Sequence, residues 1–479
     1  MKSSKKFVPT DPLNASAGRA APLLSICLIV KNEAACLGRC LSSAQEIADE
    51  IIVVDTGSTD DTVTLARSFG ATVVFSVWNN DFSHARNISL RSAAGAWLLW
   101  LDADDVIPKE SIEIIQNLKL KKPDRVLGFI VRNEKKGQTG SEFIQARMFP
   151  NRPDIFFERR IHEQMMLSAL RAGLRMEQTA AVIEHHGYAD PHTMRLKARR
   201  NIEMLLGEYD RAAPDAVTAV EIADAYSIVN DAENARKWYE TALSVPGCAE
   251  QSAHLASQAH WGLGNLLNNN ADFDAAIAHL QKALVLSPGR PDVGYSLAVA
   301  LDLSGRKDDA IERLYGVFRQ SAPPLLIGVD FREAKLKAVL RLDRLLRETG
   351  RNEEADGLAE EALTAMPHRP EIQNLAGRAY VRGGRLMDGL HAFEKSLELD
   401  RPNNIDAYVG LCQIYLRANK RENAVQTVKS VQPLYGHIPR YWALYRQCMG
   451  ESAAAEIPES IDKAEISVET ERINRQFQL

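Results

Sequence analysis

The sequence is poor in thiols. It has six cysteines in 479 residues, and none of them forms a C-x-x-C pair. A large chain with few, irregularly spaced cysteines is typical of a reducing compartment and offers no disulfide framework. Cys36 and Cys40 lie one helical turn apart. Because no further ligands follow at short spacing, we interpret them as core residues and not as a zinc site.

Long apolar runs and an excess of one charge are also missing. The longest apolar segments, 23–30 and 97–101, fall far short of the roughly 20 residues that span a membrane. Residues 1–22 lack the apolar stretch of a secretion signal, and we expect a flexible N-terminus there. The net charge of -5 gives no electrostatic reason to expect a nucleic-acid partner. These absences predict a cytoplasmic protein without a membrane span.

Short apolar runs alternate with helical patterns over residues 23–190. The runs are LLSICLIV, EIIVVD, ATVVF and AWLLWL. Continuous apolar strands separated by helices are typical of a mostly parallel sheet buried on both faces. Ligands of such sheets bind beyond the carboxyl ends of the strands, where Asp55 and the cluster 102–105 stand. The pattern predicts an α/β domain with a ligand site at this edge.

Residues 216–436 repeat with a period of 34. Ala276, Leu280 and Ala283 recur 34 residues later as Ala310, Leu314 and Val317; Ala355, Ala359 and Ala362 show the same spacing and recur 34 residues later as Gly389, Phe393 and Ser396. Small residues are needed where two helices touch, and large ones fill the gaps between them. The period and pattern predict five to six tetratricopeptide units. Residues 191–215 are expected to form a linker helix, and 437–479 a terminal helix and a frayed tail.

Three carboxylates, Asp102, Asp104 and Asp105, follow the apolar run 97–101. Neighbouring carboxylates at a strand end repel one another and require a compensating cation. Mg²⁺ prefers oxygen ligands and phosphate partners, so an ion bridging the phosphates of a nucleotide-sugar would satisfy them. The alternative is that Asp104 or Asp105 caps the helix that begins near Pro108.

Two further motifs, SICLIVKNE and VVDTGSTDDT, accompany this cluster. With them the chain resembles the family 2 glycosyltransferases of the GT-A fold, in the subgroup that carries a tetratricopeptide tail. That subgroup includes enzymes that attach sugars to peptides and proteins. The resemblance extends from residue 23 to about 435. It implies an α/β GT-A domain over residues 23–190, followed by an all-α repeat solenoid.

The resemblance implies roles for several residues. Asp55 would contact the uracil base and Asp102 the ribose, while Asp104 would hold Mn²⁺ or Mg²⁺ and act in catalysis. The main chain that lines the base pocket is that of Val30, Asn32 and Glu33.

The segment WNNDFSHARN, which contains Arg86 and Asn87, also resembles a motif of the subgroup. Arg86 is a natural partner for pyrophosphate oxygens, and Asn87 can hydrogen-bond the sugar. The alternative for Arg86 is a salt bridge to a nearby acid.

The segments RIHE and IEHHGY resemble the HE and HxGY motifs of the subgroup. By this resemblance His185 completes the metal site. An inverting transfer needs a base that takes a proton from the acceptor, and Glu163 is the candidate. The alternative for Glu163 is a structural salt bridge with Arg159 or Arg160.

The sequence therefore predicts a metal-dependent, inverting hexosyltransferase. It would move a sugar from a UDP-sugar to a peptide or protein acceptor held by the repeats, since repeat arrays present extended binding surfaces. A polysaccharide or lipid-linked acceptor and an inactive repeat scaffold are the alternatives. A nucleotidyltransferase is disfavoured because the first motif has no glycine-rich basic loop. A homodimer through the repeats is a further expected partnership, and a cut after about residue 215 is expected to spare donor chemistry.

Overall fold

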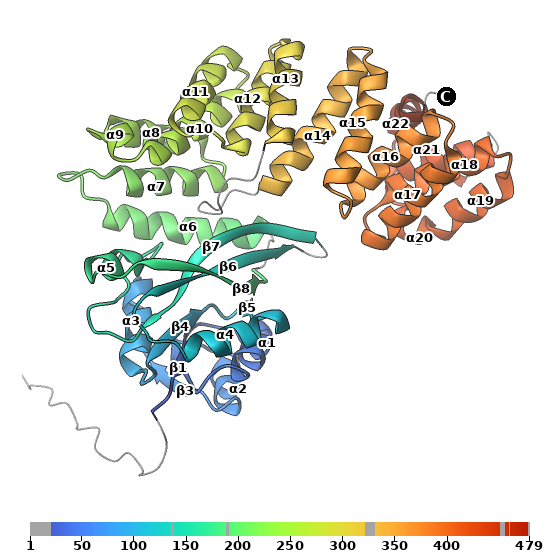
Figure 1. The fold of residues 1–479 in the computed structure, drawn as a ribbon. Coiled ribbons are helices and arrows are strands. Elements are labelled where there is room, and N and C mark those ends of the chain that lie inside the picture. Colours follow the sequence, from blue (N-terminus) through green and yellow to red (C-terminus); the bar gives the residue numbers. More distant parts are fainter. Residues whose placement is uncertain are drawn as a thin grey trace, which may run out of the picture. The chain divides into compact units, whose positions relative to one another are not determined.

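The computed structural model describes residues 21–135, 138–187, 191–320, 331–450, 456–458 and 460–477. It contains two compact units, and the main division between them falls between Asp231 and Ala232. Most of the segment expected to be a flexible N-terminus lies outside the described residues. Figure 1 shows the elements of both units, which are described separately below.

An eight-stranded sheet forms the centre of the first unit. Its strands are β1 (Leu24–Val30), β2 (Glu50–Asp55), β3 (Thr72–Phe75), β4 (Trp97–Leu101), β5 (Asp105–Val106), β6 (Val126–Lys135), β7 (Gln138–Pro150) and β8 (Met176–His185). Its helices are α1 (Ala34–Gln45), α2 (Thr62–Ser68), α3 (Phe82–Ser92), α4 (Lys109–Lys119), α5 (Met166–Arg171), α6 (Pro191–Glu208) and α7 (Ala216–Ile228). The strands and helices expected over residues 23–101 are confirmed.

The strand order is β3-β2-β1-β4-β7-β6-β8-β5. Neighbours among β3, β2, β1 and β4 are parallel, as are β6 and β8, whereas β7 runs antiparallel to β4 and β5 antiparallel to β8. The predicted α/β domain is therefore confirmed, with a mixed sheet. The short β5–β8 pairing matters for the site because it sets Asp105 directly opposite His185.

The sheet is covered on both faces, as its continuous apolar strands predict. In β1, Leu24, Ile26 and Leu28 pack with α1, α2 and α4 on one face. Cys27 points to the other face and packs with Leu90 of α3 and with residues of α5. Figure 1 shows these two helical layers on either side of the strands. This burial of β1 and β4 fixes the position of their carboxyl ends, where the polar residues gather.

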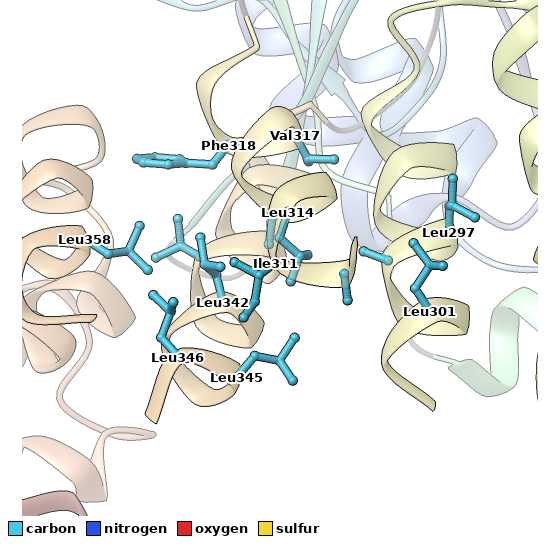
Figure 2. Packing of buried hydrophobic residues seen from close by; sticks show 14 of the residues in the cluster. Leu297, Leu301, Ile311, Leu314, Val317, Phe318, Leu342, Leu345, Leu346 and Leu358 are labelled. Atoms are coloured by element: carbon cyan, nitrogen blue, oxygen red, sulfur yellow. The ribbon is translucent and has the colours of Figure 1, made fainter. Parts of the chain in front are cut away.

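The second unit consists of helices. They are α8 (Ala232–Ser244), α9 (Cys248–Gln251), α10 (Ala253–Asn269), α11 (Phe273–Leu286), α12 (Pro291–Leu303), α13 (Lys307–Arg319), α14 (Phe331–Glu348), α15 (Asn352–Ala365), α16 (Pro370–Arg382), α17 (Leu386–Leu399), α18 (Ile405–Arg417), α19 (Arg421–Ser430), α20 (Gln432–Tyr435), α21 (Pro439–Met449) and α22 (Lys463–Phe477). One apolar core runs from α11 to α16. Figure 2 shows leucines of α12, α13 and α14 meeting within it.

The period of 34 has a direct steric basis. A Cβ atom on Gly377 of α16 would lie 2.8 Å from the ring of Phe393 in α17, and one on Gly410 of α18 would lie 2.2 Å from it. Gly264 of α10 meets Leu280 of α11 in the same way, at 2.6 Å. Small residues on the first helix of a unit thus leave room for a large residue on its neighbour. The repeat prediction is confirmed.

The chain end differs from expectation. Residues 463–477 form α22, with Ile466, Ile473 and Phe477 buried in a core shared with α18 and α21. The frayed tail expected after residue 450 is therefore wrong for this stretch. These three apolar residues are spaced by seven and four positions, so they lie on one face of a helix. This spacing is the sequence signal that would have predicted α22.

Candidate functional site

A cleft of about 430 Å³ opens at the carboxyl ends of β1 and β4 in the first unit. The loop after β1, the start of α3, the loop after β4, the segment 161–163, the end of β8 and helix α6 all contribute to it. The predicted residues that line it are Val30, Glu33, Arg86, Asp102, Asp104, Glu163 and His185. Residues far apart in sequence thus meet where the strand pattern predicts a ligand site.

Arg86 is buried and bridges two carboxylates. Its Nη2 donates to Asp102 Oδ1 at 2.8 Å, and its Nε donates to Glu163 Oε1 at 2.6 Å. The guanidinium also lies 4.2 Å from the ring centroid of Trp100. The structure thus shows Arg86 in salt bridges, and the partner of Glu163 is Arg86, not Arg159 or Arg160.

This ion pair decides the charge of Asp102. Burial alone would raise the pKa of its carboxyl, but the neighbouring Arg86 and Arg147 guanidinium groups outweigh burial and lower the pKa to about 2. Burial likewise opposes the charged form of Arg86, yet Asp102 and Glu163 together raise its pKa. Arg86 and Asp102 are therefore both charged at neutral pH, and Arg86 joins Asp102 to Glu163.

Asp105 and His185 are joined behind the cleft. Asp105 is fully buried; its Oδ2 accepts from Arg147 Nη1 at 2.7 Å and from the Asp102 backbone N–H at 2.8 Å. Its Oδ1 lies 2.9 Å from His185 Nδ1. Because an ionised carboxylate can only accept, this contact places a proton on Nδ1 and leaves Nε2 as the ring nitrogen that Asp105 does not hold. Neither Asp104 nor Asp105 caps α4, whose N-cap is Pro108.

Asp104 faces the cleft beside this pair. Its Oδ1 lies 3.5 Å from His185 Nδ1, and its carboxylate is partly buried. Burial raises its pKa; His185 opposes the rise, and the charges of Asp102 and Asp105 add to it. Among the described residues, Asp102, Asp105 and His185 have potential ligand atoms within 4.8 Å of one another. The chain therefore contains an Asp–Asp–His group that could hold a metal ion.

Three predicted residues lie outside the cleft lining. Asn87 donates from Nδ2 to the Phe157 carbonyl and accepts the Phe157 N–H, both at 2.8 Å, so both ends of its amide hold the main chain. The sugar contact expected from Asn87 stays a prediction, and in the structure Asn87 holds the main chain of Phe157. Asn32, whose main chain was expected to line the base pocket, is not part of the cleft lining, and its Oδ1 accepts the Thr59 N–H at 2.7 Å. Asp55 is buried and accepts the amides of Gly57 and Ser58, each at 3.1 Å.

Several residues of the cleft were not anticipated. Helix α6, expected as a linker, supplies Lys197 and Arg200, and the loop after β1 supplies Lys31. The Arg200 guanidinium lies 5.1 Å from the Phe82 ring, and burial lowers its pKa. Positions 197 and 200 are three residues apart and so lie on one face of a helix. This spacing of two basic residues is the sequence signal that could have predicted their place in the cleft. Asp105 was noted in sequence, but its contact with His185 depends on the pairing of β5 with β8.

Residues 25–176 match the model of the glycosyl transferase family 2. This match covers strands β1 to β7, with Arg86, Asp102, Asp104 and Glu163, and ends where β8 begins, before His185. The first unit contains a family 2 glycosyltransferase domain. Residues 220–291, 269–320 and 374–436 match tetratricopeptide repeat models, so this glycosyltransferase carries C-terminal repeats.

Two relatives match parts of this chain. The TPR repeat-containing protein Synpcc7942_0270 of Synechococcus elongatus is 29% identical over 85% of this chain and 91% of its own length. The SPbeta prophage-derived glycosyltransferase SunS of Bacillus subtilis is 31% identical over 38% of this chain and 44% of its own length. The match to SunS thus spans less than half of that protein.

A solved structure, the C-terminal part of a TPR repeat-containing protein from Cytophaga hutchinsonii, is 16% identical. It covers 51% of this chain and 93% of its own, with a TM-score of 0.39. Separately, no helix in the part of the chain that the structure describes combines the length and the apolar character needed to cross a membrane.

Proposed function

We propose that this glycosyltransferase moves a sugar from a UDP-sugar to a peptide or protein acceptor, with inversion and with a divalent metal. The observation that carries the proposal is one cleft holding both a carboxylate–histidine group (Asp104, His185) and an arginine-bound carboxylate (Glu163). The first group fits a metal-bound diphosphate, and the second fits a general base.

For the metal, we propose His185 Nε2 and the Asp104 carboxylate as ligands, with Mn²⁺ or Mg²⁺ as the ion. The donor set fits, because Asp105 holds the other ring nitrogen of His185, as is usual behind a metal-bound histidine. The raised pKa of Asp104 also fits a carboxylate that lacks a cation. A divalent ion bound there would offset the charge that develops on the departing diphosphate.

For the donor phosphates, Arg86 is a poor partner because two carboxylates already neutralise it. Lys197 and Arg200 line the same cleft, and no ion pair with either is found among the described residues. We therefore assign the diphosphate contacts to these two side chains of α6. Asp102, kept ionised by Arg86, remains the candidate for the ribose hydroxyls.

Glu163 is the proposed base. Its Oε1 is held by Arg86 Nε at 2.6 Å, which fixes the carboxylate at the cleft. Oε2 makes no hydrogen bond to the described residues and is free to accept the acceptor's proton. The acceptor nucleophile would then attack the sugar carbon from the side opposite the departing UDP, which gives inversion.

The proposal is tested by UDP release from a panel of UDP-sugars, measured with Mn²⁺, with Mg²⁺ and with EDTA. Release from at least one UDP-sugar, raised by an acceptor protein or peptide, is expected. A donor preference for GDP- or dTDP-sugars would contradict the UDP assignment. Stimulation by polysaccharide or lipid-linked glycans instead of peptides would contradict the acceptor assignment.

Asp55→Ala should weaken UDP binding about tenfold or more. The carboxylate is proposed to accept a hydrogen bond from the base, and losing such a bond costs on the order of 1–3 kcal/mol. Since Asp55 also holds the Gly57 and Ser58 amides, Asp55→Asn serves as the control that retains one acceptor oxygen. Calorimetry with UDP measures both variants. Wild-type UDP affinity in Asp55→Ala would remove Asp55 from the base pocket.

Deleting residues from Ala232 onward should spare UDP-sugar hydrolysis and abolish transfer to a protein acceptor. All candidate donor and metal residues lie in the first unit and precede Asp231, where the main division between the units falls. The cut is placed here and not after about residue 215, because a cut at 215 would also remove α7, which belongs to that unit. The measurement compares UDP release with acceptor glycosylation. Full transfer by the truncated protein would show that the repeats do not hold the acceptor.

A further inference from the structure

The segment that carries Glu163 has an unusual backbone. Arg159 and His162 have φ values of 73° and 51°, in the left-handed region that residues with side chains rarely adopt. Such conformations persist only where surrounding contacts hold them. The segment lies between the strand β7 and the helix α5, and it presents His162 and Glu163 to the cleft. What holds Arg159 and His162 therefore helps to set the position of Glu163.

Both left-handed residues are held by one carboxylate, that of Glu221 in α7. Arg159 donates from Nη1 to Glu221 Oε1 at 2.9 Å and from Nη2 to Oε2 at 2.6 Å, a bidentate pair. His162 Nδ1 lies 3.1 Å from Glu221 Oε1. The Arg159 and Glu221 side chains are each only 18% exposed, so their pairing is shielded from water, whereas the His162 side chain is 45% exposed.

Other contacts hold other parts of the segment, including Arg86, which holds the Glu163 carboxylate itself at 2.6 Å. Glu158 and Gln164 pair through their main chains at 3.0 and 3.1 Å, which closes the base of the segment. The Phe82 N–H donates to the Arg160 carbonyl at 2.8 Å. These bonds fix the ends and one central carbonyl. The side chains of Arg159 and His162 converge on Glu221, with Thr218 of the same helix 3.3 Å from Arg159 Nη2.

Helix α7, which carries Glu221, is capped at its start and belongs to the first unit. Asp215 caps its first turn by accepting the Thr218 N–H at 3.0 Å, and the helix belongs to the same compact unit as the cleft. The tetratricopeptide match begins at residue 220, so the anchoring helix lies at the start of the repeat sequence. The chain thus uses the first helix of its repeats to support its active-site segment.

We propose that Glu221 is a positioning residue: it holds segment 159–163 so that the Glu163 carboxylate meets the acceptor's proton. Glu221 does not line the cleft, and its effect passes through Arg159 and His162. The inference rests on the proposed role of Glu163 as the base. Errors of about 1 Å in such a group cost roughly 100-fold in rate.

The test uses the full chain and compares Glu221→Gln, Glu163→Gln and the double variant. Glu221→Gln is expected to lower kcat roughly 10- to 100-fold while the Kd for UDP stays within about twofold. In the Glu163→Gln background, Glu221→Gln should lower kcat by less than about twofold more, because its effect acts through Glu163. Glu203→Gln, an exposed change on α6, is the matched control.

Arg159→Lys tests the same contact if Glu221→Gln folds poorly, since lysine keeps the charge but cannot form the bidentate pair. Unchanged kcat in both variants would overturn the proposal. Multiplicative losses in the double variant would also overturn it, because they indicate a role that does not pass through Glu163. A Glu163→Gln variant with wild-type kcat would instead overturn the assignment of the base.

Discussion

Glu163→Gln is expected to lower kcat for sugar transfer by roughly 10² to 10⁴-fold, the range typical of a lost general base. Gln can still accept the Arg86 Nε–H bond, so the local arrangement around Arg86 and Asp102 should survive. It cannot take a proton at the acceptor. The change should therefore appear in kcat and leave UDP binding close to that of the wild type.

The measurement is steady-state transfer at saturating UDP-sugar, with UDP affinity measured by calorimetry. Glu203→Gln, on an exposed position of α6, is the control for a Glu→Gln change in the same unit. A Glu163→Gln enzyme with a kcat within threefold of the control would show that Glu163 serves only as the partner of Arg86. Loss of UDP binding would assign Glu163 to the donor site.

Chelation is expected to abolish transfer, and added Mn²⁺ or Mg²⁺ should restore it. Asp102 and Asp104 line the cleft and Asp105 is buried behind it, while Arg86 pairs with Asp102 and Arg147 with Asp105. A diphosphate would add further negative charge beside Asp104. Without a cation, this charge would oppose donor binding and departure of UDP.

His185→Ala should lower activity at limiting metal by at least about 100-fold. Removing a residue that only supports a metal ligand typically costs 10- to 100-fold, and His185 is proposed as a direct ligand. His186→Ala is the matched control, since its side chain lies next in sequence and is not part of the Asp–Asp–His group. Activity is measured against metal concentration for both variants. Full activity of the wild type in excess EDTA would remove the metal from the mechanism.

The motifs located the site because each follows the end of a buried strand. Asp102 and Asp104 follow β4, and the residues around Val30 follow β1, so parallel pairing of β1 with β4 brings both to one edge. The helical repeats could also be predicted from the sequence, because each repeat mainly contacts its neighbours along the chain. Local periodicity is enough to predict such contacts.

The sequence did not predict which hydrogen-bond and salt-bridge partners come from distant segments of the chain. Arg86 could meet a phosphate or an acid, and only the packing of α3 against the segment 161–163 shows that it meets Asp102 and Glu163. Asn87 illustrates the same limit, since its amide bonds a main chain 70 residues away. A polar side chain does not reveal its partner, because many groups in the chain could satisfy the same hydrogen bonds.

By itself, the sequence determined that this chain has a family 2 glycosyltransferase domain with tetratricopeptide repeats, because strand and helix periods and spaced motifs are local properties. The tertiary structure alone decided that Asp105 stands behind His185, that α6 supplies Lys197 and Arg200, and that α7 belongs to the first unit. Each of these depends on which elements pack together. Packing is decided by the burial of whole faces and the pairing of strands, which no single segment encodes.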